Sequence, residues 1–254
     1  MNDEKIKQSS FTEHLTELRS RLIRSFIYIF IFFIICYFFA ENIYSFLVEP
    51  YAQAVKDDGV DRRLIFTALH ETFIVYLKVA FFTSLFVTSP LILTQIWKFI
   101  APGLYKNEKR ALLPYLIATP TLFLLGAMLV YYLVMPLAIK FFLSFETSAQ
   151  INSLPIQLEA KVNEYLSLIM RLIFAFGISF QLPVLLTLLA RVGFIDSEYL
   201  KKRRKYVIVI IFAVAAILTP PDPITQIGLG IPLLILYELS ILSVKIIEKN
   251  KKDA

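Results

Sequence analysis

The sequence predicts an all-α polytopic membrane protein with six transmembrane helices, forming a single integral membrane domain over residues 1–254. Two observations carry this prediction. Hydrophobic residues make up 57% of the 254 residues, whereas a soluble chain has about 45–50%. These apolar residues also fall in long runs, separated by segments that are alternately rich and poor in Lys and Arg. Such a pattern is typical of a chain whose solvent is lipid.

Six apolar stretches are the candidate spans, and they cover residues 22–40, 73–96, 111–135, 165–190, 206–218 and 224–244. The first four are long enough for a hydrocarbon core of roughly 30 Å. The fifth reaches only about 20 Å at 1.5 Å per residue, and a tight turn at 219–223 joins it to the sixth. We therefore expect the last two helices to be short, as a hairpin that locally thins the bilayer.

Basic residues indicate the orientation of the spans. Of the 26 Lys and Arg residues, 19 lie in the segments 1–24, 97–110, 191–205 and 245–254. Because basic loops stay on the cytoplasmic side, both termini are predicted to be cytoplasmic. Membrane topology thereby accounts for the net charge of +6, and nucleic acid is not expected as a partner.

Prolines interrupt several of the predicted spans, at Pro90, Pro114, Pro120 and Pro183. A proline inside a helix removes a backbone hydrogen bond and kinks the helix, and neighbouring groups must satisfy the freed carbonyl. The sequence therefore predicts kinked helices around a concave face.

Residues suited to catalysis are not grouped in the sequence. By the predicted topology, His14 and His70 lie at opposite membrane faces, so they cannot share a metal or a proton. The one cysteine, Cys36, lies inside an apolar run. The chain is therefore not expected to be an enzyme or to hold a metal or another cofactor.

Two carboxylates near the predicted cytoplasmic face each allow two interpretations. After a capping box at Ser10 and Glu13, Glu17 either forms an i,i+4 pair with Arg21 or is available to a ligand. Glu108 either stabilises the positive end of the third span or serves the same ligand. Two such carboxylates are suited to gripping guanidinium groups in bidentate geometry.

One polar side chain, Gln181, lies near the middle of the fourth span. Polar groups there usually face a partner or a wet cavity. A satisfied hydrogen bond between helices is the alternative interpretation.

Four segments resemble the TatC family, the multi-span subunit of the twin-arginine protein translocase. They are HLTELRSRL at 14–22, QIWKFIAPGLYKNEKR at 95–110, FGISFQLPV at 176–184 and LTPPD at 218–222. The resemblance implies a receptor for the twin-arginine signal peptides of folded cargo proteins. It also implies a bacterial inner-membrane location, single-span partners of the TatA/TatB type in an oligomeric complex, contact with membrane lipid, and transport driven by the proton motive force.

The resemblance also assigns roles to individual residues. It places the signal-peptide carboxylates at Glu17 and Glu108, and adds to that binding region Arg19, Phe99, Pro102 and Leu104. Pro50, Gln181 and Asp222 correspond to family positions for polar or partner contacts. The family often has glutamate where this chain has Gln181, so this chain does not offer a negative charge at that position.

A secondary transporter of a small solute is the alternative function. Such a protein needs an enclosed site near the midplane of the membrane, with discontinuous helices or paired ionisable residues. The sequence offers only Gln181 at that depth, which favours the receptor.

Overall fold

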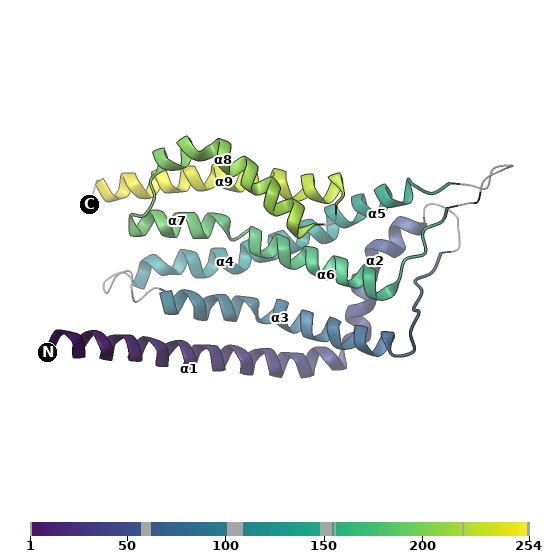
Figure 1. Ribbon diagram of the computed structural model, residues 1–254, viewed down its shortest axis with the longest axis horizontal. Helices are drawn as coiled ribbons and strands as arrows, with labels where there is room; N and C mark the ends of the chain where they lie inside the picture. The colour runs from purple at the N-terminus through teal and green to yellow at the C-terminus, as the bar shows by residue number, and fades with distance from the viewer. Residues whose placement is uncertain are drawn as a thin grey trace. The chain divides into compact units, whose positions relative to one another are not determined.

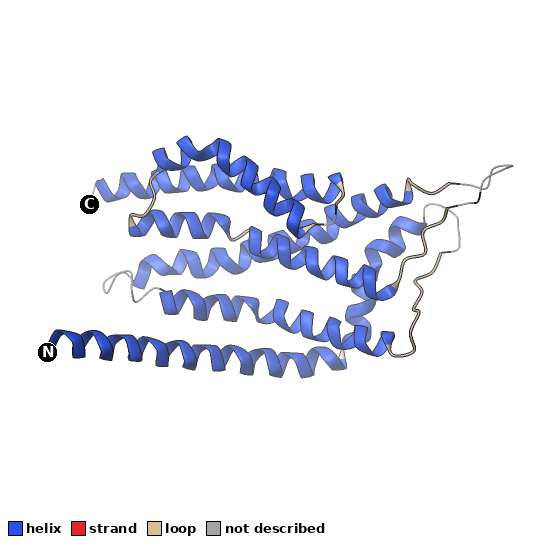
Figure 2. Cartoon of the chain, in the orientation of Figure 1, coloured by secondary structure: helices blue, strands red, loops and turns tan. Residues whose placement is uncertain are grey.

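The computed structural model describes residues 2–56, 62–100, 109–147, 154, 156–219 and 221–252. Within these residues the regular structure is helical, which confirms the all-α prediction (Figures 1 and 2). The helices are α1 (Asn2–Phe38), α2 (Ala40–Lys56), α3 (Glu71–Ile100), α4 (Lys109–Leu129), a π-helical turn (Val130–Val134), α5 (Met135–Leu143), α6 (Val162–Ser179), α7 (Leu182–Val192), α8 (Ser197–Leu218) and α9 (Pro223–Lys252).

Five helical segments in the described residues are long and apolar enough to cross a membrane, so the chain is a multi-span membrane protein. They are Leu15–Phe38, Glu71–Ile96, Pro114–Leu143, Val162–Val192 and Pro223–Lys249. The remaining predicted span, 206–218, forms the C-terminal part of α8. That helix has 22 residues, but a run of basic residues occupies its first half.

The chain forms two compact units, which are described separately. The first unit contains Met1–Ile43 and Tyr76–Pro120, and the second contains Tyr44–Val75 and Thr121–Ala254. In the first unit, α1 contacts α3 through an edge-to-face pair of Phe33 and Phe81, with ring centroids 6.4 Å apart. Such pairs stabilise a contact beyond the burial of area alone.

The start of the first helix differs from the sequence-based expectation. The capping box at Ser10 and Glu13 predicted a helix beginning there, whereas α1 begins at Asn2 and runs without interruption to Phe38. The residues after Ser10 and the first predicted span are therefore one continuous helix, with Leu15, Leu18 and Leu22 exposed along it.

In the second unit, α9 packs against α7 and α8. The buried residues at this junction come from all three helices: Ala190, Leu200, Tyr237, Ile241 and Val244. The Tyr237 hydroxyl donates to the Leu200 carbonyl oxygen at 2.8 Å. A buried hydroxyl needs such a partner, so this bond fixes the two helices in one register.

Close backbone packing occurs between the second-unit part of α4 and α6. A Cβ atom built at Gly126 would lie 2.8 Å from the Phe176 carbonyl oxygen, and one at Gly177 would lie 2.6 Å from the Phe123 ring. Small residues allow helix backbones to approach in this way in membranes. No larger side chain fits at Gly126 without a backbone shift.

Pro50 lies inside α2 and lacks the N–H that would bond to the Phe46 carbonyl, four residues earlier. The Tyr131 hydroxyl, from the π-helical turn, donates to that carbonyl oxygen at 2.8 Å. The Tyr131 and Phe46 rings also stack, with centroids 4.5 Å apart. A tyrosine from a distant part of the chain thus satisfies the carbonyl that Pro50 leaves without its usual donor.

An ion pair ties together the segments that follow α2 and α5. Arg62 Nη1 lies 2.6 Å from Glu146 Oε1, and the two side chains are 5% and 18% exposed. The same Glu146 oxygen accepts the Leu158 N–H at 2.7 Å. Close by, burial raises the pKa of the Tyr51 phenol, and the Arg62 guanidinium opposes that shift more weakly. This ion pair holds three chain segments at one point.

Candidate functional site

The first candidate carboxylate, Glu17, lies on α1 and pairs with Arg21 one turn later. Arg21 Nε and Nη2 both donate to Glu17 Oε1, at 3.0 and 2.6 Å. Arg21 Nη1 donates to Gln95 Oε1 on α3 at 3.1 Å. The i,i+4 interpretation of Glu17 is thus what the structure shows, and Gln95 adds a contact that sequence spacing did not reveal.

The Glu17–Arg21 pair still leaves the carboxylate accessible. Both bonds from Arg21 use Oε1, and within the described residues Oε2 accepts no hydrogen bond. The Glu17 side chain is 38% exposed, against 19% for Arg21. Because Arg21 is also held by Gln95, it fixes the orientation of the carboxylate while Oε2 remains open to a second guanidinium.

Phe99 lies on α3 one turn after Gln95, so the two residues share a face of the helix. Its side chain is half-buried. Arg19 lies only two residues after Glu17, and residues at that spacing do not face each other on a helix. The structure therefore groups Glu17, Arg21 and Gln95 and directs Arg19 elsewhere.

Three further residues predicted for this site, Pro102, Leu104 and Glu108, lie outside the described residues. The helix α4 begins at Lys109, directly after Glu108. The pairing of Glu17 with Glu108 therefore stays a prediction.

Gln181 lies at the break between α6 and α7, where the fourth predicted span changes direction (Figure 1). Its backbone N–H donates to the Ile178 carbonyl oxygen, three residues back, at 2.9 Å, as is common where an α-helix ends. The side-chain Nε2 donates to the Gly177 carbonyl oxygen at 3.4 Å. Gln181 thus has a local role in capping α6, and it lies partly buried at the helix break.

Asp222 has a well-defined structural role at the start of α9. It is 3% exposed and accepts the Thr225 N–H at 2.7 Å and the Thr225 hydroxyl at 2.5 Å. This is the geometry of an N-cap, with Pro223 in the first helical position.

Pro50, the third residue assigned to partner contacts, is buried in α2. Pro50, Gln181 and Asp222 therefore belong to three separate local arrangements.

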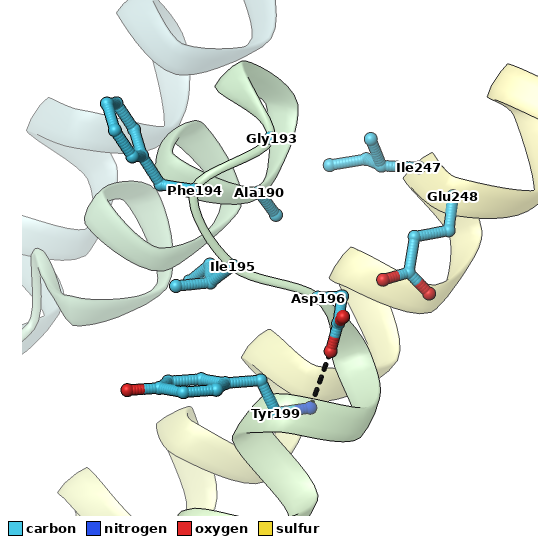
Figure 3. Close-up of a pocket in the computed structure, with 8 residues that line it drawn as sticks. All are labelled: Ala190, Gly193, Phe194, Ile195, Asp196, Tyr199, Ile247 and Glu248. Carbon is cyan, nitrogen blue, oxygen red and sulfur yellow. Dashed lines mark hydrogen bonds between the residues drawn. The ribbon is translucent and has the colours of Figure 1, made fainter.

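A shallow pocket of about 280 Å³ lies where α7, α8 and α9 meet (Figure 3). Its two carboxylates are both engaged at the start of α8. Asp196 accepts the Tyr199 N–H at 2.5 Å, and Glu248 accepts the Ser197 N–H and hydroxyl, each at 2.6 Å. The arrangement therefore stabilises a helix N-terminus and attaches α9 to it.

Comparison with known proteins gives one consistent result. The family model described as "Sec-independent protein translocase protein (TatC)" matches residues 13–232. The TatC of Magnetococcus marinus is 47% identical over 253 residues, covering 100% of this chain and 90% of that protein. The TatC of Rickettsia prowazekii is 46% identical over 96% of this chain and 95% of its own length. A crystal structure of the twin-arginine translocase receptor TatC superposes with a TM-score of 0.76 at 39% identity, covering 92% of this chain and 99% of that one.

Proposed function

Because the chain belongs to the TatC family of Sec-independent protein translocase proteins, we propose that it is a receptor for twin-arginine signal peptides. It serves as the core subunit of a translocase that exports folded proteins, driven by the proton motive force. Support comes from the solved relative, which is named a twin-arginine translocase receptor. The family is one of translocase proteins, in agreement with the prediction that the chain is not an enzyme.

The topology we propose has six spans in a bacterial inner membrane, with both termini in the cytoplasm. Five spans are the apolar segments of the structure, and the sixth is the C-terminal part of α8. The turn before Pro223 leads directly from α8 into α9, as a membrane hairpin requires. Basic residues cluster at the N-terminal end of α8 and at the end of α9, which is the distribution expected of a cytoplasmic side.

The carboxylate Glu17 is the observation on which the proposed recognition rests. Its Oε1 is held by Arg21, and Arg21 is held by Gln95. The carboxylate is therefore already oriented before a ligand binds, and binding does not have to immobilise it. An incoming arginine can then donate to Oε2 in a charge-assisted bond. We propose that Glu108 supplies the second carboxylate, and that Phe99, Pro102 and Leu104 line the same region, with Arg19 beside it on another face of α1.

Partners of the single-span TatA/TatB type are the second part of the proposal. Gln181, at the helix break, offers an amide to a polar group on such a helix. Asp222 contributes indirectly, because it caps the start of α9. Pro50 contributes indirectly through the Phe46 carbonyl that it leaves to Tyr131. A Gln181→Leu variant should crosslink less to partner helices, and unchanged crosslinking would exclude a contact at this residue.

The test of the receptor function is binding of a twin-arginine peptide to the full chain in detergent, with a twin-lysine peptide as the control ligand. Glu17→Gln keeps the size of the side chain and removes its charge, so it should weaken binding of the arginine peptide. Glu198→Gln is the matched control, because Glu198 is an exposed carboxylate at the start of another helix, α8. Equal binding by the wild type and Glu17→Gln would rule out this carboxylate as the recognition site.

A further inference from the structure

The N-terminal half of α8 carries five consecutive basic residues at positions 201–205, all of them exposed. One of them, Arg204, is paired with Glu238 of α9 at 2.7 Å. Among the described residues, the other four form no ion pair with a carboxylate. Most of the positive charge of this segment is therefore available to an external anion.

Aromatic rings hold part of this basic segment in place. The Arg203 guanidinium carbon lies 5.3 Å from the centroid of the Tyr199 ring and 5.6 Å from that of Tyr206. Lys205 Nζ lies 5.1 Å from the Tyr206 centroid. Cation–π contacts of this length are attractive. Arg203 is consequently oriented along the outer surface of α8 before any ligand binds.

The same face of α8 becomes apolar one turn later. Lys202 and Arg203 precede Tyr206 by four and three residues, so the three side chains are neighbours on the helix surface. Val209 and Ile210 follow at the same spacing and are 67% and 57% exposed. In a membrane protein, such apolar side chains face lipid, and tyrosine occupies the level between lipid and water.

The order of cation, tyrosine and apolar side chain corresponds to the order of phosphate, ester and acyl chain in a phospholipid. We propose that the face formed by Lys202, Arg203, Tyr206, Val209 and Ile210 binds one anionic phospholipid. Its phosphate lies between Lys202 and Arg203, and its acyl chain follows Val209 and Ile210. A zwitterionic headgroup carries its own ammonium, which these two cations repel, so the site discriminates by net headgroup charge.

The proposal requires that the chain crosses a membrane, and it does not depend on the receptor function or on the orientation of the spans. The sequence contains a single tryptophan, Trp97, so a new tryptophan can report on one place. In the full chain, Trp97→Phe removes the native signal. Ala213→Trp then places a reporter at an exposed position of α8, one turn beyond Val209, and leaves all five site residues intact.

The experiment compares fluorescence quenching in vesicles of phosphatidylcholine that contain the same minor fraction of either brominated phosphatidylglycerol or brominated phosphatidylcholine. Brominated phosphatidylglycerol should quench the reporter more strongly, because each nearby basic side chain enriches an anionic lipid about fivefold. In Lys202→Gln/Arg203→Gln, the two brominated lipids should quench to nearly the same extent.

A matched control removes the same charge from α9. Lys245 and Lys249 are exposed, and Lys245→Gln/Lys249→Gln should keep most of the excess quenching. Equal quenching by the two brominated lipids in the unmutated reporter chain would overturn the proposal, and would leave an acidic protein segment as the better occupant. An equal loss of quenching in both double variants would also overturn it, because a diffuse surface charge would then explain the attraction.

Discussion

The ion pair between Arg62 and Glu146 provides a sharp test of how the loops of the second unit are held. The change is Glu146→Gln, which removes the negative charge but keeps an oxygen that can accept the Leu158 N–H. Arg62 then remains almost fully enclosed, at 5% side-chain exposure, without its carboxylate at 2.6 Å. The variant therefore isolates the effect of the charge from that of the hydrogen bond.

The expected effect follows from the burial of the two side chains. Breaking a fully buried ion pair destabilises a protein by about 3–5 kcal/mol. Glu146 is 18% exposed, and water reaches part of the pair, so we expect a loss of about 2–3 kcal/mol. The substitution Arg62→Met should destabilise the Glu146→Gln variant by less than it destabilises the wild type, because the charge that Arg62 pairs with is already gone. The difference between the two losses is the coupling energy, and we expect roughly 1–2 kcal/mol.

The assay is unfolding of the full chain in mixed micelles with increasing SDS, together with trypsin cleavage at the exposed Arg63. Glu164→Gln is the control, because Glu164 lies 3.9 Å from Lys161 in a pair that is 73% and 44% exposed. An exposed pair of this kind contributes at most about 1 kcal/mol. If Glu146→Gln were no more destabilising than Glu164→Gln, or if the coupling were zero, the buried pair would not be what holds these loops.

Three other variants test separate features of the second unit, each by the same unfolding measurement. Tyr131→Phe should destabilise by about 0.5–1.5 kcal/mol, since the Phe46 carbonyl loses its donor; restoring an N–H in α2 by replacing its proline should reduce that loss. Gly126→Ala should cost about 1–3 kcal/mol, because the added methyl group meets the Phe176 carbonyl oxygen, and a neutral result would show that α4 can shift. Asp222→Ala should cost about 0.5–2 kcal/mol as a lost N-cap, whereas Asp222→Asn should retain most of the stability.

Long apolar runs made the helical class and the main spans predictable. The helix α2 was not predicted, although a signal for it exists. Its buried residues Leu47, Tyr51 and Ala54 recur at helical spacing, and Glu49 and Gln53 are exposed between them. The stretch is only 17 residues long and contains a proline, so its pattern is short and interrupted. The contact with Tyr131, which compensates for that proline, connects residues 85 positions apart.

The candidate site was predictable in its residue types and less so in its geometry. The spacing of Glu17 and Arg21 indicated a pair, and the structure contains it. The contribution of Gln95 depends on how α1 meets α3, and no local pattern encodes that contact. Gln181 was predicted as a polar residue inside an apolar span, and its position at a helix break agrees with the kink predicted from the nearby Pro183.

The π-helical turn Val130–Val134 inserts about one residue into an otherwise α-helical crossing. Buried positions before the turn include Phe123 and Ala127, and those after it include Met135 and Ala138. Deleting a single residue here would let an ordinary helix run through. Met135 and Ala138 would stay on the buried face, because the extra residue of the turn adds almost no net rotation, whereas a one-residue deletion in an uninterrupted helix such as α1 would rotate everything beyond it by about 100°. The chain should accordingly tolerate the loss of one residue at this turn better than anywhere else in its spans, while the buried Val130 and Val134 remain sensitive to substitution.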